Sequence, residues 1–433
     1  MAAGGPAAIR GARTRDLLDR EPMLASRRVL LAVVVAALGY FVDLYDVVLF
    51  SILRVPSLKS IGVPDAQLVH TGALLLDLQL AGMIVGGVVL GVLGDRRGRV
   101  SVVFGSIVVY SLANLANAFV TSVAGYAALR FVAGFGLAGE LGAGITLVAE
   151  LLPRERRGLG TTVVASVGLT GALAAGLIAE FLLRKFGVGG FRYAYALGGI
   201  MGLLLLGLRV GLLESGLYAR AEQSGAARGD VRMLLAPAER LQRFVRVVLV
   251  GMPIWYVGGV LFIFAPELGG AMGLAQRPTG GNTIFYAYLG VVIGDITSGL
   301  LSQRLRSRKR VIGGFLTLLL ASVLALLTFG GRSLGTFYGL MCLVGFATGY
   351  WVLFVTTASE QFGTNLRATV TTSAPNFVRG TAIPISAVWL ALKSPMGVIA
   401  ATAAVGVVCI AVGLIALMGM RESFDADLDR MEE

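Results

Sequence analysis

Long apolar runs dominate this sequence and decide what the chain can fold into. Each run matches the roughly 20 residues that an α-helix needs to cross the hydrocarbon core of a bilayer. With 56% hydrophobic and only 14% charged residues, the chain cannot bury its apolar surface in one aqueous core. The predicted fold class is therefore an all-α integral membrane protein with twelve transmembrane helices, over residues 29–53, 69–93, 100–121, 125–152, 159–183, 192–213, 244–267, 282–303, 311–330, 335–360, 368–391 and 397–420.

Basic residues gather in every second connection between these runs. After the second, fourth, sixth and eighth runs the connections contain Arg96, Arg97 and Arg99, then Arg154, Arg156 and Arg157, then Arg220 to Arg246, then Arg304 to Arg310. Basic loops stay in the cytoplasm. We therefore expect both termini to be cytoplasmic in a bacterial inner membrane, and we assign the net charge of +12 to topology and not to nucleic acid binding.

One long polar stretch divides the chain into two halves. The expected organisation is a cytoplasmic, disordered N-terminal tail, a six-helix half, a cytoplasmic linker, a second six-helix half and a cytoplasmic C-terminal tail, at residues 1–28, 29–213, 214–243, 244–420 and 421–433.

The two halves repeat each other in sequence. Glu150 and Arg157 correspond to Glu360 and Arg367, 210 positions later. The stretch Gly91-Val-Leu-Gly-Asp-Arg96 corresponds to Gly299-Leu-Leu-Ser-Gln-Arg304, 208 positions later. Two independent matches at nearly one offset indicate two parallel repeats, related by a pseudo-twofold axis along the membrane normal.

Three motifs resemble the major facilitator superfamily. Residues 91–99 (GVLGDRRGR) resemble its signature between helices two and three, and residues 130–136 (RFVAGFG) its helix-four motif. Residues 209–215 (RVGLLES) are similar to the Arg…Glu-Ser that ends helix six in sugar and metabolite porters. The second-half copy of the first motif departs from the pattern, with Gln303 in place of aspartate and Arg306 in place of glycine.

The resemblance implies a conformational latch at the cytoplasmic ends of the helices. In the family, such charge clusters are taken to hold the outward-open state. An anion such as Asp95 is favoured at a helix N-terminus, and nearby arginines can reach carboxylates at helix ends. The alternative is a basic loop that only sets topology. The expected latch residues are Gly91, Asp95, Arg96, Gly98, Arg99, Glu150, Arg157, Glu360 and Arg367.

Acidic residues inside the apolar runs are the candidates for proton coupling, because an ionisable group at membrane depth is costly. They are Asp43, Asp46, Glu140 and Asp295. Asp43 and Asp46 are three residues apart and should share a helix face. Two carboxylates in one low-dielectric cavity do not both ionise easily, so we expect one to hold a proton. The alternative is a cation-binding pair.

The run Asp43-Leu44-Tyr45-Asp46 resembles the Asp-Gly-Tyr-Asp of aromatic-acid:proton symporters, with Leu44 in place of the glycine. It also resembles the paired aspartates of phosphate:proton symporters. The resemblance implies a proton-coupled carrier and leaves both substrate classes open.

Arg379 is the candidate for binding an anion. Pro375, Gly380 and Pro384 predict a bent helix around it, with polar backbone available to line a cavity. The guanidinium offers a planar fork for a carboxylate or phosphate. Alternatively, Arg379 only neutralises a buried acid such as Asp295. The full set of expected substrate-binding residues is Arg379, Arg130, Tyr40, Asn376, Trp255, Tyr256, Tyr350 and Trp351.

The sequence contains no nucleotide-binding loop, metal-ligand cluster or nucleophile–base pair, so we expect neither an enzyme nor a cofactor. Cys342 and Cys409 lie in apolar runs, as expected of free thiols. The predicted function is secondary active transport: proton-coupled symport of a small organic anion, a carboxylate, by alternating access. The alternatives are phosphate:proton symport, organic-cation or drug:proton antiport, and a non-transporting membrane sensor. The expected partners are the substrate, protons and the bilayer, and the chain should be a monomer.

Overall fold

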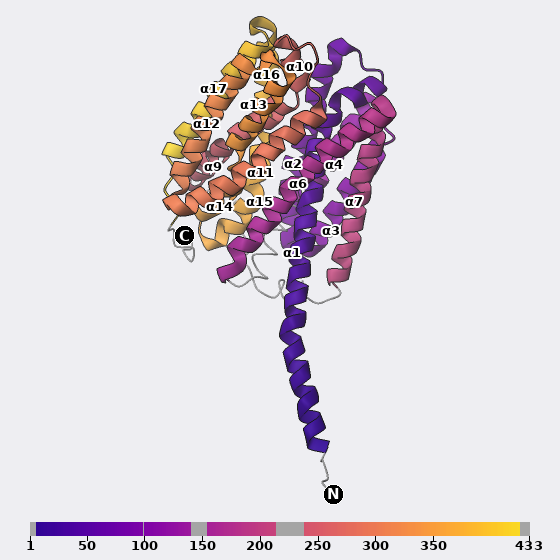
Figure 1. Ribbon diagram of the computed structural model, residues 1–433, viewed down its shortest axis with the longest axis vertical. Coiled ribbons are helices and arrows are strands. Elements are labelled where there is room, and N and C mark those ends of the chain that lie inside the picture. Colours follow the sequence, from indigo (N-terminus) through magenta and orange to yellow (C-terminus); the bar gives the residue numbers. More distant parts are fainter. Residues whose placement is uncertain (1–5, 98, 140–153, 214–237, 425–433) are drawn as a thin grey trace.

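The computed structural model describes residues 6–97, 99–139, 154–213 and 238–424. These parts are helical almost throughout, and no strand occurs in them. Within the same ranges, eight helical segments are long and apolar enough to cross a membrane. Shorter and broken helices complete twelve passes (Figure 1).

The N-terminal half makes the first six passes. Its helices are α1 (Pro6–Ser60), α2 (Leu68–Arg97), α3 (Arg99–Asn117), α4 (Val123–Leu137), α6 (Arg154–Phe186) and α7 (Gly190–Leu213). Small residues bring the helices close together. Gly134 of α4 packs against the backbone of Gln79 of α2, where a Cβ would clash.

The C-terminal half makes the other six passes, and three of them are interrupted. Its helices are α9 (Ala238–Tyr256), the π-helical turn Val257–Phe262, α10 (Ala265–Ala271), α11 (Gly280–Leu305), α12 (Arg308–Phe329), α13 (Leu334–Thr348), α14 (Trp351–Glu360), α15 (Thr364–Gly380), α16 (Ala382–Met396) and α17 (Val398–Met418). The helical pass that contains Arg379 is divided at Thr381 into α15 and α16, close to where we predicted a bend.

The helix α1 begins much earlier than the first predicted span. It starts at Pro6 and extends out of the bundle as a single long helix (Figure 1). The expectation of a disordered tail was therefore wrong. Alanine, leucine and arginine, which have high helix propensity, are frequent before Val29, so the helix continues beyond the apolar run.

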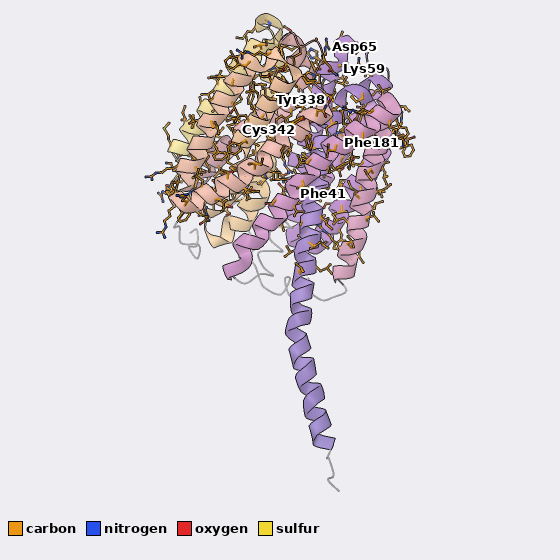
Figure 2. All side chains as sticks on the ribbon, in the orientation of Figure 1. Phe41, Lys59, Asp65, Phe181, Tyr338 and Cys342 are labelled. Atoms are coloured by element: carbon orange, nitrogen blue, oxygen red, sulfur yellow. The ribbon has the colours of Figure 1, made fainter. Side chains whose placement is uncertain are left out.

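The bundle has two ends, which we name by the position of the chain termini. Both termini lie toward the lower end of Figure 1, at what we call the terminal face. The opposite end is the distal face, where Lys59 and Asp65 form an exposed ion pair at 3.0 Å (Figure 2). The halves meet along α6 and α11, and along α2, α15 and α16.

Candidate functional site

A buried ion pair joins the two halves near the middle of the bundle. Nη2 of Arg379, at the end of α15, lies 3.6 Å from Oδ2 of Asp43 in α1. The two side chains are 2% and 0% exposed. Such a pair is costly to bury, and removing either partner leaves an uncompensated charge. Because burying the two charges brings little stability, the pair is a candidate functional site.

The Arg379 guanidinium has spare hydrogen-bonding capacity. Its Nε and Nη1 atoms are buried and have no hydrogen-bond partner. Arginine presents its donors in a planar fork that matches the two oxygens of a carboxylate. A buried donor without a partner costs about 1–3 kcal/mol. The fork is thus held in place by α15 and Asp43, and two of its nitrogens are not used by any described group.

Aromatic side chains surround the ion pair. Tyr40 of α1 and Tyr288 of α11 both lie within electrostatic reach of Arg379, Asp43 and Asp295. Trp351, the first residue of α14, lies against the hydroxyl of Tyr40. From the sequence, Tyr288 is one of the aromatics in apolar runs that could line a cavity, although it is not in the set of expected substrate-binding residues given above. Its only sequence signal is a polar aromatic facing the interior of an apolar run, which many packing residues share.

Asp295 bonds to the start of α14 and does not pair with Arg379. Its Oδ1 accepts a hydrogen bond from the backbone N–H of Val352, at 3.2 Å, in the first turn of α14. A carboxylate is stabilised at a helix N-terminus by the free N–H groups and the helix dipole. The ion-pair partner of Arg379 in the structure is Asp43 and not Asp295.

Asp46 lies in a different environment from Asp43. It is 1% exposed and faces Asn114 of α3, Arg130 of α4 and the backbone of Gly198 of α7, inside the N-terminal half. Spacing alone placed the two acids on one face. Three residues correspond to 300° of helical rotation, however, and the 60° difference turns one acid to the interface and the other inward.

Arg130 is held within the N-terminal half. It donates a hydrogen bond to Oε1 of Gln79, and its guanidinium lies over the rings of Phe50 and Tyr195, at 4.7 and 5.8 Å from their centroids. The position of Arg130 beside Asp46 and these ring contacts hold its guanidinium inside the N-terminal half.

A small cavity lies between the halves, toward the distal face from the ion pair. Its volume is about 30 Å³, which holds one or two waters but no organic acid. Helices of both halves line it, including Ser51, Gln79, Trp255 and Tyr288. Tyr288 lines the cavity and also lies within electrostatic reach of the ion pair, so the two features adjoin.

Three predicted substrate-binding residues make bonds elsewhere. The hydroxyl of Tyr256 donates to the carbonyl of Thr402, at 2.8 Å, and that of Tyr350 to the carbonyl of Val250, at 3.0 Å. Asn376 donates to the carbonyl of Ala138, at 3.3 Å, across the halves. Of the predicted set, the structure gathers Arg379, Tyr40 and Trp351 around Asp43, with Trp255 on the cavity wall.

A charged clasp closes the halves at the distal face. Arg54 of α1 is fully buried, and its Nη2 donates to both carboxylate oxygens of Glu267 in α10, at 2.7 and 2.6 Å. Its Nε also donates to the carbonyl of Ile263, at 3.1 Å. Arg54 lies just beyond the predicted end of the first span, so it does not stand out in the sequence as a charge within an apolar run.

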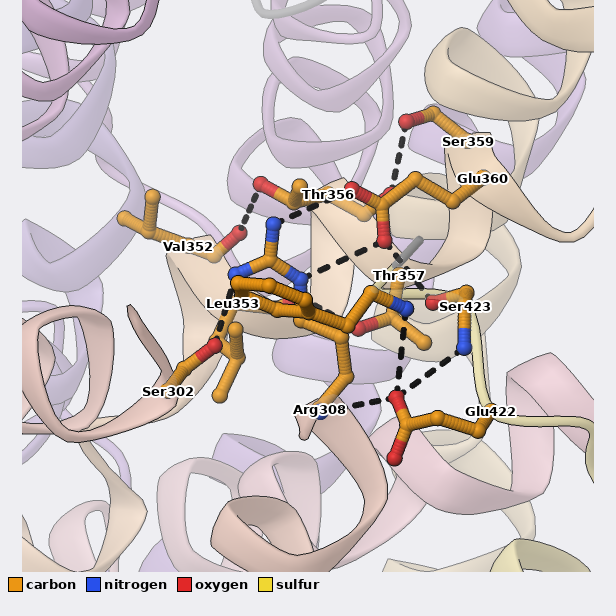
Figure 3. A network of polar contacts seen from close by, with 11 residues as sticks. Ser302, Arg308, Val352, Leu353, Thr356, Thr357, Ser359, Glu360, Glu422 and Ser423 are labelled. Carbon is orange, nitrogen blue, oxygen red and sulfur yellow. Dashed lines mark hydrogen bonds and ion pairs between the residues drawn. The ribbon is translucent and has the colours of Figure 1, made fainter. Parts of the chain in front are cut away.

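The predicted latch residue Glu360 takes part in a network at the terminal face (Figure 3). It forms an ion pair with Arg308 at 3.1 Å and accepts a hydrogen bond from the hydroxyl of Ser423 at 2.8 Å. Arg308 also donates to the hydroxyl of Ser302, at 2.6 Å. Glu422 accepts a hydrogen bond from the N–H of Arg308, at 2.9 Å, and thereby ties the C-terminal segment to α12.

The remaining predicted residues fall outside the part of the chain that the structure describes. Glu140, Glu150 and Gly98 belong to the omitted segments. The surroundings of Gly91 and the side chains of Asp95, Arg96, Arg99, Arg157 and Arg367 are not described either.

Two bundled halves, closed over a buried ion pair, are the architecture of a membrane transporter and not of an enzyme. The chain belongs to the Major Facilitator Superfamily, whose family model matches residues 29–387. The fold agrees with the inward-open xylose transporter XylE from E. coli, at a TM-score of 0.70 over 93% of this chain and 98% of that one, with 18% identity.

Named transporters are similar to this chain along most of its length. The niacin transporter NiaP of Acinetobacter baylyi is 26% identical, over 77% of this chain and 80% of the relative. The gentisate transporter of Corynebacterium glutamicum is 25% identical, over 79% and 77%. The 4-hydroxybenzoate transporter PcaK of Pseudomonas aeruginosa is 32% identical over a shorter stretch, 37% and 35%.

Proposed function

We propose that this protein is a proton-coupled symporter of a small organic carboxylate. The observation that carries the proposal is the Arg379–Asp43 pair, in which Arg379 keeps two buried donors without a hydrogen-bond partner. A substrate carboxylate would satisfy these donors in a bidentate, charge-assisted contact, the strongest kind of hydrogen bond available to arginine.

The same pair supplies a reason for coupling to protons. Once a substrate carboxylate engages Arg379, Asp43 loses its compensating charge at a fully buried position. An uncompensated buried carboxylate costs several kcal/mol, so it neutralises by taking a proton. Substrate and proton then bind together, and the loaded site is electrically close to neutral as it crosses the membrane.

An aromatic acid fits the surroundings best. Tyr40 and Tyr288 lie within electrostatic reach of the guanidinium, and Trp351 lies against Tyr40, so aromatic side chains are gathered near Arg379. Offset or edge-to-face contacts with a substrate ring are worth about 0.5–1.5 kcal/mol beyond area burial. Niacin, gentisate and 4-hydroxybenzoate, in the names of the relatives, are all aromatic carboxylates.

In this proposal the distal face is extracellular, and the terminal face, with both termini, is cytoplasmic. The substrate would enter when the Arg54–Glu267 clasp opens and leave when the terminal face opens. The Arg308–Glu360 network would act as a latch there. By the internal repeat, the first-motif arginines and Glu150 would do the same in the other half. The chain would work as a monomer in a bacterial inner membrane.

Phosphate symport and organic-cation antiport are the competing functions within transport. Phosphate carries up to two charges, whereas Arg379 is the one arginine that the described residues place beside the aromatic cluster. A cation would need Asp43 to leave Arg379 without any replacement anion. Neither competitor uses the spare donors of Arg379 as well as a monocarboxylate does.

The test is uptake into proteoliposomes with the interior alkaline. The panel contains radiolabelled nicotinate, gentisate, 4-hydroxybenzoate, succinate, phosphate and tetraethylammonium, with protein-free liposomes as the leak control. We expect an aromatic carboxylate to accumulate only while the pH gradient lasts. Asp43→Asn should lose this accumulation while retaining exchange at equal pH. Gradient-driven flux of phosphate or of the cation instead would overturn the proposal, and absence of any flux would favour a sensor.

A further inference from the structure

A line of buried polar side chains runs through the interior of the N-terminal half, away from the ion pair. Ser111, Asn114 and Asn117 follow each other at intervals of three along α3, so each is turned about 60° from the one before it and the three spread over about 120° of the helix surface. All three are buried, at 0%, 1% and 0% exposure. We call them the α3 polar file.

The polar file borders Asp46. The amide of Asn114 faces the Asp46 carboxylate. The hydroxyl of Ser111 and the carboxylate of Asp46 both lie against the glycine face of α7, at Gly202 and Gly198 respectively. The helices α1 and α3 therefore both pack on α7, and these polar groups lie near that face of α7.

The atoms of this file have unmet hydrogen-bonding capacity. Ser111 Oγ, Asn114 Nδ2, both amide atoms of Asn117 and both carboxylate oxygens of Asp46 are buried without a hydrogen-bond partner. Buried polar groups are normally satisfied by protein or by ordered water, and each one left alone costs about 1–3 kcal/mol. So many unsatisfied atoms along one helix are best satisfied by a chain of waters.

The file leads to the distal face. Asn117 is the last residue of α3. Phe119, two residues later, is 78% exposed, and Thr121 and Ser122 in the connection to α4 are also exposed. The spacing of the file leaves one helical turn between each polar group and the next, a distance that one or two waters span.

We propose that the α3 polar file holds a water chain that carries protons between the distal face and Asp46, separately from the path of the substrate. This inference rests on the proposed proton coupling. In this scheme Asp46 receives its proton through the N-terminal half. Asp43, at the interface between the halves, instead gives up Arg379 and takes a proton. The substrate gate can then stay closed while a proton enters.

The charges around Asp46 favour a proton over a metal cation. Arg130 of α4 faces it from one side, and Asp43 lies one turn away on α1. Tyr195 of α7 and the neutral Asn114 complete the surroundings. A cation would be repelled by the guanidinium, whereas a proton removes the charge of Asp46 without adding a positive centre.

The experiment separates proton entry from substrate movement. Asn117→Leu and Asn114→Leu, of similar side-chain volume, remove the polar atoms of the file. Each variant is assayed for nicotinate uptake driven by an inside-alkaline gradient and for nicotinate counterflow at equal pH, which needs no proton to leave the carrier. We expect the gradient-driven initial rate to fall about tenfold, with counterflow within about twofold of wild type.

Two controls identify the cause. Asn117→Ser keeps a hydroxyl that can hold water, so it should restore at least half of the driven rate. Ser322→Ala removes a buried hydroxyl that bonds to Leu318 in α12 of the other half, and it should leave both assays unchanged.

The outcomes are distinct. Equal driven rates in wild type and Asn117→Leu, or an equal fall in both assays, would overturn the water chain while leaving symport intact. Driven uptake that follows a sodium gradient at equal pH would make the file a cation site and would also overturn it. If wild-type protein shows counterflow but no response to the pH gradient, the proposed coupling itself fails, and the inference fails with it.

Discussion

Arg379 has an internal partner and also keeps donor atoms that the proposed substrate would use. Its pairing distance to Asp43 of 3.6 Å is longer than a good charge-assisted hydrogen bond. Two of its nitrogens have no acceptor. A lysine would supply the same charge at a single point and not a planar fork.

We therefore predict that Arg379→Lys binds nicotinate at least tenfold more weakly than wild type, and that Arg379→Gln shows no measurable binding, because only the fork satisfies two carboxylate oxygens at once. Scintillation proximity binding to purified protein measures both. Arg192→Lys, at an arginine that bonds to the carbonyls of Ala118 and Val120 near the distal face, is the matched control. Equal affinity of Arg379→Lys and wild type would show that charge alone suffices.

At this scale the sequence singled out charged residues that the structure buries inside the bundle, but it did not show which of them are partners. Charge within an apolar run was enough to select Asp43, Asp46, Asp295 and Arg379. Which acid meets Arg379 depends on helix rotation, on the register between α1 and α15, and on the cap that α14 offers to Asp295. None of these three is encoded in the spacing of charges along one helix.

Among the elements, the turn from α11 to α12 contains a strained residue. Arg306 ends α11 with φ 48° and ψ 41°, a left-handed conformation. It corresponds to Gly98 of the first half, 208 positions earlier, in the repeat recognised from the sequence. Glycine adopts this conformation without a Cβ penalty, whereas other L-residues pay about 1–2 kcal/mol.

Arg306→Gly should consequently raise the free energy of unfolding by about 0.5–1 kcal/mol. Thermal unfolding of the purified protein in detergent would show it as a higher midpoint. Arg304→Gly lies inside the last turn of α11 and should instead destabilise by about 1 kcal/mol. A lower midpoint for Arg306→Gly would mean that contacts of the arginine outweigh the backbone strain.

The distal clasp joins α1 to α10 and should control opening at that face. In Glu267→Gln the amide replaces a carboxylate that accepts two bonds from buried Arg54. We expect the closed state to lose about 1–2 kcal/mol, which is a five- to thirtyfold shift toward open. Pulsed electron spin resonance between labels at the exposed residues Val188 and Arg332, in a cysteine-free background, would show a longer distance. An unchanged distance distribution would exclude the clasp as a gate.

Element breaks were only partly predictable. Proline and glycine near Arg379 predicted a bend close to the break between α15 and α16. The break between α13 and α14 was not predicted, because its marker, Gly349, is one of 60 glycines. That glycine matters because its backbone packs directly on Gly294 and Asp295 of α11, a contact between elements that no local pattern shows.

At the scale of the whole molecule, the internal repeat relates segments that lie far apart in the sequence. Glu422-Ser423 stands 208 positions after Glu214-Ser215, at the same offset as the loop motif. In the second half Glu422 accepts bonds from the start of α12, through the hydroxyl of Ser307 and the N–H groups of Arg308 and Lys309, while Ser423 donates to Glu360.

The contact of Glu422 with α12 should depend on pH. Partial burial opposes it, but hydrogen bonds from Ser307 and from the N–H groups of Arg308, Ser423 and Phe424 hold the pKa of Glu422 below its usual 4.5. A lowered pKa means that the carboxylate's contribution is present above pH 4.5 and is lost as the pH falls through the folded value. Hydrogen exchange at Arg308 and Lys309 should therefore accelerate, after correction for intrinsic rates, only in acid.

The variant Glu422→Gln is the control for that prediction, since it should exchange at one corrected rate across the same pH range. Loss of protection in wild type already at about pH 6 would contradict the assignment to Glu422.

The overall architecture was the most predictable level. Span lengths, the alternation of basic loops and two matches at one offset were enough for twelve helices in two halves. These features repeat many times along the chain, so single errors do not matter. The site depends on a few contacts between α1, α11, α14 and α15. Each is a single tertiary contact, so no repeated sequence pattern indicates it.

The central claim is that a substrate carboxylate displaces Asp43 from Arg379 and that the freed acid takes a proton. Proton uptake on binding tests this most directly, in weakly buffered detergent solution near pH 7 with a pH-sensitive dye. Adding nicotinate to wild-type protein should consume about one proton for each ligand bound. Asp43→Asn should bind the ligand without consuming any. Binding to wild type with no change in free protons would contradict the claim.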